Sequence, residues 1–198
     1  MYLRTDEESE AANALFMANK LSNELDSDIR NWRWVIIALH NAAQGFMVLS
    51  LRHGNGLLAL SKESHAEWME AYRNDSPTFP KEKLDSYENL YKKVKNKSTG
   101  EFGGNTRFIP TGSQGGSILK LNSIRNEFIH FTPKGWSLGV TGLPQVCIDC
   151  LALISFLGWE TNNVFWHRPE YKEEARLNAE RLKEKMKALK KLYATASS

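Results

Sequence analysis

The sequence predicts an all-α fold, an up-and-down helical bundle with a long first core helix and an extra charged helix near the C-terminus. Apolar residues recur at helical spacing in most segments of the chain. The stretch Trp34–Leu51 contains no Asp, Glu, Lys or Arg, as expected for a helix buried inside a bundle. The sequence shows neither an internal repeat nor a strand–helix–strand pattern.

Composition indicates one ordinary globular domain of 198 residues, of which 41% are hydrophobic and 25% charged. The net charge of +3 permits nucleic-acid binding without requiring it. We expect a single domain, 1–198, with a core at about 28–166 and helical extensions at 6–23 and 170–193. The acidic, polar start Met1–Glu8 does not resemble a signal peptide, so we expect a cytoplasmic protein with no membrane partner.

The first two helices are predicted from capping residues and apolar spacing. Asp6–Asn23 reads as an amphipathic helix, and Asp28 suits the N-terminus of the long helix, which ends near 53–56. The predicted buried face of the long helix comprises Ile29, Trp32, Ile36, Leu39, Ala43, Phe46 and Ser50. Arg33, His40 and Gln44 line another side, which favours a protein-buried helix with one polar seam over a membrane span.

Short helices and loops are predicted in the middle of the chain, with a helix at Ser64–Arg73 and a loop at 74–80. Apolar spacing places the next helix on Leu84, Tyr87, Leu90, Tyr91 and Val94. Residues 98–116 form a long glycine-rich segment, and an irregular segment of this length is usually either functional or disordered. Within it, Arg107 and Phe108 pair a cation with an aromatic ring, as in proteins that bind single-stranded RNA.

The C-terminal third is predicted to hold a core helix over Leu143–Trp166 and a charged helix at 170–193. The second half of the charged helix is basic, and a solvated outer face is favoured over an RNA-contacting arm. Cys147 and Cys150 have CxxC spacing inside a helix. Because zinc needs four ligands and the chain has no second cysteine pair, we interpret both as core residues and expect no metal site.

The helix over Ser117–His130 carries the most informative polar residues. Its apolar face is predicted to comprise Ile118, Leu121, Ile124, Phe128 and Phe131. Asn122, Asn126 and His130 form a polar stripe on the flank. Arg125 falls among apolar positions, so it must reach solvent, turn toward the His130 side or find an anionic partner. Gly115–Gly116 precede this helix and offer backbone N–H groups to a phosphate, although N-capping by Ser117 is favoured.

These residue types suit phosphodiester chemistry. An arginine binds a phosphate through two hydrogen bonds, and a histidine accepts or donates a proton. The other interpretation is structural, with Arg125 in a salt bridge and His130 in a hydrogen bond. His40 and Gln44 of the long helix, together with Asn122, are expected to support the site.

The motif Arg125-Asn126-x-x-x-His130 resembles the Arg-polar-x-His signature of the HEPN superfamily, and the resemblance covers about residues 28–166. It implies a HEPN-type helical bundle in which Arg125, Asn126 and His130 form the catalytic site. Many members are metal-independent endoribonucleases, and others serve as binding or dimerisation modules. Some are toxins silenced by modification of a tyrosine after the histidine, which Phe131–Trp136 does not contain.

From the resemblance we expect a cofactor-free endoribonuclease, of a toxin–antitoxin or defence system, in which the RNA 2′-hydroxyl attacks the adjacent phosphorus. One chain supplies a single His130, whereas the reaction needs a proton acceptor and a proton donor, so a homodimer is expected. The alternative is a non-catalytic HEPN module that partners a nucleotidyltransferase or a defence protein, with an antitoxin as a further partner. A sequence-specific DNA binder is disfavoured because no helix-turn-helix pair stands out.

Overall fold

The computed structural model describes residues 1–52, 56–96, 106–130, 133 and 135–196. Over these residues the chain is helical and contains no β-strand, which confirms the all-α prediction. The helices are α1 (Glu7–Ser22), α2 (Trp32–Leu51), α3 (Lys62–Arg73), α4 (Tyr87–Lys95), α6 (Gln114–Ile129), α7 (Leu143–Ser155) and α8 (Pro169–Ala196). Short 3₁₀ turns occupy Ile29–Asn31 and Leu57–Ala59, and a π turn follows α7 at Phe156–Glu160.

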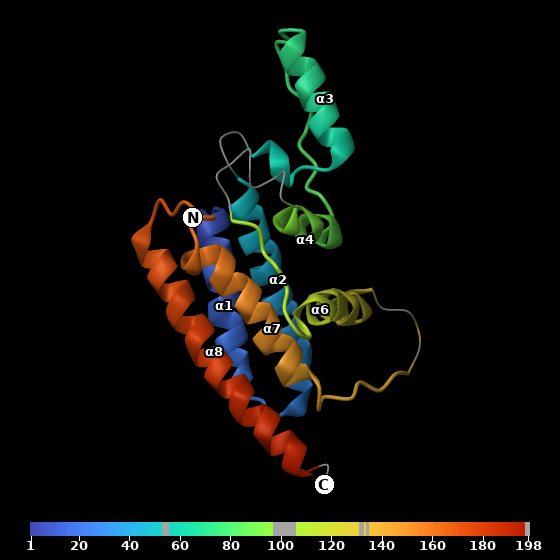
Figure 1. Ribbon diagram of the computed structural model, residues 1–198, viewed down its shortest axis with the longest axis vertical. Helices are drawn as coiled ribbons and strands as arrows, with labels where there is room; N and C mark the ends of the chain where they lie inside the picture. Colours follow the sequence, from blue (N-terminus) through green and yellow to red (C-terminus); the bar gives the residue numbers. More distant parts are fainter. Residues whose placement is uncertain (53–55, 97–105, 131–132, 134, 197–198) are drawn as a thin grey trace.

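The core lies among α1, α2, α7 and α8, which pack side by side along the long axis of the molecule (Figure 1). Helix α6 packs across α2 and α7, and α4 packs on α2. The close approach of α1 and α2 depends on Gly45, because a Cβ there would lie 3.1 Å from the Cβ of Ala11. The bundle therefore supports α6, the helix that carries the signature, from two sides.

Two predicted element starts are wrong for local reasons. Asp28 accepts a hydrogen bond from the backbone N–H of Arg30 and so caps the 3₁₀ turn, which leaves Ile29 56% exposed instead of buried. Leu84 lies before α4 and pairs with Leu60 in an isolated bridge. The helix begins later because the side chain of Ser86 caps it. The other residues predicted for the buried face of the long helix are buried.

The last core helix also ends earlier than predicted. The α-helix stops at Ser155, and the π turn brings Gly158 against the ring of Phe46. Any Cβ at Gly158 would lie 2.6 Å from that ring. Two helical segments, Ile29–Leu51 and Leu143–Glu160, are long and apolar enough to cross a membrane, but 61% and 67% of their apolar windows are buried inside the fold. They are weak evidence of a membrane protein, because core helices pass the same test.

Helix α3 projects from the bundle as an arm (Figure 1). The base of this arm is fastened by backbone hydrogen bonds from Ser61 N–H to the Lys83 carbonyl and from Asp85 N–H to the Ala59 carbonyl, of 2.9 and 3.0 Å. Lys93 of α4 adds an ion pair to Asp85 of 2.6 Å. Within the arm, the ring of Trp68 stacks on the ring of Tyr72 and on the ring of Phe79.

Candidate functional site

Helix α6 is fixed at its N-terminal end by Asp149 of α7, a carboxylate that is 6% exposed. Asp149 accepts hydrogen bonds from the hydroxyls of Ser113 and Ser117, of 2.7 and 2.5 Å, and from the Gln145 amide, of 2.7 Å. The prediction that Ser117 caps the helix is therefore wrong. Ser117 lies within α6 and ties it to α7. The helix begins earlier, at Gln114, because the serine hydroxyls are engaged by α7.

Gly115 and Gly116, which precede the predicted helix start, lie in the first turn of α6. Phosphate binding by their N–H groups, the alternative that the sequence disfavoured, stays untested. The apolar face of α6 is otherwise as predicted, with Ile118, Leu121 and Ile124 buried and Phe128 half-buried. Phe131, predicted for the same face, lies outside the described residues.

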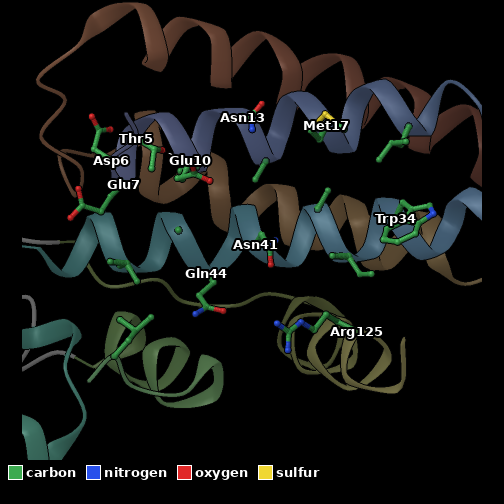
Figure 2. A pocket seen from close by; sticks show the side chains of 18 residues that line it. Thr5, Asp6, Glu7, Glu10, Asn13, Met17, Trp34, Asn41, Gln44 and Arg125 are labelled. Carbon is green, nitrogen blue, oxygen red and sulfur yellow. Dashed lines mark hydrogen bonds between the residues drawn. The ribbon is translucent and has the colours of Figure 1, made fainter. Parts of the chain in front are cut away.

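Arg125 is half-buried and turns toward a groove between α1 and α2 (Figure 2). Its Nη1 donates a hydrogen bond of 3.0 Å to Oδ1 of Asn126. Its Nε is buried without a hydrogen-bond partner, and among the described residues no carboxylate forms an ion pair with it. The guanidinium thus retains donors and a positive charge for an anionic ligand.

His130 is the residue that follows the C-terminal end of α6. Its backbone N–H donates to the carbonyl of Asn126 at 2.9 Å, and the residue is exposed. Within the described part of the chain, its ring makes no hydrogen bond, and it does not line the groove that Arg125 enters. The structure therefore joins Arg125 to Asn126 by a side-chain hydrogen bond, and no such bond joins the His130 ring to either among the described residues.

Two of the predicted supporting residues, His40 and Asn122, form a seam between α2, α4 and α6. His40 is 1% exposed, its Nε2 lies 3.0 Å from Oδ1 of Asn122, and its ring stacks on Tyr87 at a centroid distance of 4.3 Å. The amide nitrogen of Asn122 donates to Oε1 of Glu88 at 3.4 Å. Because Oδ1 can only accept, Nε2 of His40 carries the proton. The seam fixes α6 relative to α2 and α4.

The pKa of His40 is lowered to about 4, mainly by burial; the hydrogen bond to Asn122 opposes this shift, and the positive charge of Arg125 adds to it. His40 is therefore neutral near pH 7. A buried neutral ring that is stacked on Tyr87 and hydrogen-bonded to Asn122 is suited to positioning the helix that carries Arg125 and not to exchanging protons with a substrate.

Gln44 lines the groove that Arg125 enters, together with Trp34 and Asn41 of the same helix. Sequence reasoning missed Trp34 and Asn41. Their positions in the sequence could have indicated them, because both lie on the flank of a helix whose opposite face is apolar. That flank could not be recognised as a groove wall without knowing that α1 packs beside it.

One predicted RNA contact is wrong. Phe108 is 5% exposed and packs against Phe156 and Tyr91, at centroid distances of 5.3 and 6.5 Å. Its backbone N–H donates to the Val94 carbonyl at 2.9 Å, which turns the ring into the core. It cannot stack on a nucleobase, whereas Arg107 is exposed.

The two cysteines are buried and free, as predicted, and burial raises the pKa of Cys147 to about 12. Among the described residues, no group of three or more His, Cys, Asp or Glu side chains could hold a metal ion. On α8, Lys185 pairs with Asp26, Lys187 with Glu184, and Lys190 donates to Gln145. These contacts engage three of the basic side chains within the chain, and the solvated outer face stays a prediction.

No family model, no curated protein and no solved structure matches the chain in comparisons with known proteins. The chemistry of the site is therefore argued from its own residues. An unpaired guanidinium and an adjacent amide can bind an anion such as a phosphate, and an exposed imidazole can accept or donate a proton.

Proposed function

We propose that the chain is a HEPN-type, metal-independent endoribonuclease that uses Arg125, Asn126 and His130. The observation that carries the proposal is the state of Arg125, which is half-buried, bonded only to the neighbouring Asn126 among the described residues, and unpaired by any described carboxylate. A guanidinium held in this way can bind the phosphate and stabilise the charge that develops during transfer. The exposed ring of His130 is accessible to move a proton.

Arg125 lines the groove and His130 of the same chain does not, which supports a composite site. Cleavage by the 2′-hydroxyl needs one proton acceptor and one donor, and each protomer carries one His130. Two chains related by a two-fold axis would supply two imidazoles and two guanidiniums. We propose a homodimer that joins the exposed sides of the two α6 helices, with RNA as substrate and an antitoxin or defence protein as a regulatory partner in the cytoplasm.

The test is incubation of the purified protein with mixed RNA in EDTA, beside His130→Ala and Arg125→Ala. We expect cleavage that persists in chelator, leaves 2′,3′-cyclic phosphate ends and is absent on DNA, which lacks the attacking hydroxyl. A single deoxynucleotide at the cut site should block cleavage there. Cleavage that requires magnesium, or that proceeds equally on DNA, would refute the mechanism.

Light scattering at micromolar concentration tests the composite site separately. A dimer is expected as the smallest active unit, and a strictly monomeric protein that still cleaves RNA would contradict it. The second candidate is a non-catalytic HEPN binding module. The hydrogen bond between Arg125 and Asn126 favours it, because that bond already engages the amide of Asn126. An intact dimer that cleaves no RNA would support this module.

A further inference from the structure

The groove that Arg125 enters has a volume of about 860 Å³ and runs between the outer faces of α1 and α2. Its floor is apolar and includes Ala14, Met17, Ile37 and Ala38. Its size lies within the range of binding sites for small organic ligands. Three polar groups interrupt the apolar lining on the α2 and α6 side, and these are Asn41, Gln44 and Arg125.

Charge is distributed unevenly along this groove. Figure 2 shows Asp6, Glu7 and Glu10 gathered at one end and Trp34 at the other, with Arg125 between them. The acidic end is already engaged. Asp6 is ion-paired with Arg168, Glu7 pairs with Arg52 at 2.9 Å, and Glu10 accepts from the Thr5 hydroxyl. Arg125 is the one cationic side chain among the described residues that line the groove, and no described carboxylate forms an ion pair with it.

The end of the groove beyond Arg125 offers an aromatic surface. Trp34 is 49% exposed, and the guanidinium of Arg33 lies 5.0 Å from its ring centroid. Toward the acidic end, Gln44 presents an amide that makes no hydrogen bond to another described residue. Arg125 lies between Trp34 and Gln44 along the groove (Figure 2).

We propose that this groove binds a dinucleotide segment of single-stranded RNA. Arg125 holds the phosphodiester, Trp34 stacks on the base of one nucleoside, and Gln44 hydrogen-bonds the base edge of the other. A purely apolar ligand would leave the Arg125 charge half-buried and unpaired, and a polyanion longer than this segment would meet the acidic end. The proposal deepens the proposed function, because it assigns the nucleotides on either side of the phosphate that Arg125 binds.

The experiment measures binding of a fluorescent 2′-deoxy-substituted oligonucleotide, which cannot be cleaved, to the full chain by anisotropy. Trp34→Ala should weaken binding about 10-fold or more, the loss typical of removing one stacking ring. Trp34→Phe should restore most of it. Trp68→Ala, on the projecting arm, is the matched control and should leave the affinity unchanged. Gln44→Leu should alter the order of affinities among oligonucleotides of different base composition without reducing affinity for all of them equally.

The outcomes separate this inference from the proposed function. Tight, Trp34-dependent binding without RNA cleavage would leave the groove assignment standing and overturn the nuclease. RNA cleavage with unchanged KM and unchanged base preference in Trp34→Ala and Gln44→Leu would overturn the groove assignment alone. Displacement of the oligonucleotide by oleate, or a Trp34→Ala protein that is monomeric where the parent is a dimer, would also overturn it, since the groove would then hold an acyl chain or a second copy.

Discussion

His40 and His130 occupy opposite environments within the same site region. His40 is 1% exposed, hydrogen-bonded to Asn122 and stacked on Tyr87, and its pKa is lowered to about 4. His130 is exposed, and within the described residues its ring has no hydrogen-bond partner. One imidazole is part of the packing of the fold, and the other is accessible to a substrate. The same residue type therefore packs inside the fold at one position and is exposed at the other, where we propose that it takes part in catalysis.

The burial of each histidine ring indicates whether that residue affects stability or activity. A histidine whose ring is enclosed loses freedom to exchange protons, because its charged form is penalised by burial. We therefore expect substitutions at His40 to alter stability first and activity second. Substitutions at His130 should alter activity and leave stability nearly unchanged.

The largest expected effect is on catalysis at His130. His130→Ala should reduce RNA cleavage by about 10²- to 10⁴-fold, the usual contribution of a general acid or base. The free energy of unfolding should change by less than about 0.5 kcal/mol, as for an exposed site. Cleavage rates on a defined RNA and urea unfolding curves provide the measurement, with His65→Ala on α3 as a control that retains full activity. Full activity in His130→Ala would place the nuclease elsewhere.

The next effect is a pH dependence of stability that originates at His40. Between pH 6.5 and about 4 the unfolded chain binds a proton that the folded chain does not, so stability falls as the pH falls through this window. The loss from this group should approach about 3 kcal/mol at the lower end. Urea unfolding at several pH values measures it. His40→Gln keeps a donor for Asn122 and should flatten the dependence, and an unchanged slope in that variant would contradict the assignment.

A smaller effect is expected from the partner of His40. Asn122→Ala leaves the buried Nε2 proton of His40 unpaired, which should destabilise the fold by about 1–3 kcal/mol. Ser123→Ala, at the exposed neighbouring position, should change stability by less than about 0.5 kcal/mol. Equal stability of the two variants would show that the hydrogen bond to His40 contributes nothing.

The smallest effect concerns Asn126, which accepts hydrogen bonds from the Arg125 side chain and from the backbone N–H of His130. Asn126→Ala removes one neutral acceptor from Arg125, a change worth about 1 kcal/mol. Cleavage should slow by roughly 2- to 10-fold, with the dimer and its stability retained. A loss as large as that of His130→Ala would assign Asn126 a direct role in the chemistry.

The sequence predicted the helices that apolar spacing and capping residues define locally. Helix α1 (Glu7–Ser22) matches the predicted helix Asp6–Asn23 to within a residue at each end, and the buried positions of α2 and α6 follow from their 3.6-residue period. Errors arose where tertiary contacts overrode a local signal. Ser117 was predicted as a cap but bonds Asp149, which lies far away in sequence, and Phe108 was drawn into the core.

The site was predictable in its residues and not in its geometry. The motif pointed to Arg125 and His130. The polar seam of the long helix pointed to His40, and the polar stripe of the helix over Ser117–His130 pointed to Asn122. The sequence left open whether Arg125 turns toward His130. In the structure it turns instead toward α1 and α2, because the groove between them offers space and a partly solvated path for the guanidinium. A choice of this kind depends on which helices become neighbours.

The projecting arm of α3 has a consequence for tolerance to sequence change. Its ends are brought together by the Ser61–Lys83 and Asp85–Ala59 hydrogen bonds, and on α3 itself only Ser64 is buried. A segment that begins and ends at neighbouring points and contributes little to the core can be shortened, lengthened or replaced with little penalty to folding. The arm is accordingly where a fluorescent label or an inserted tag should disturb the bundle least, and where homologous chains should differ most in length.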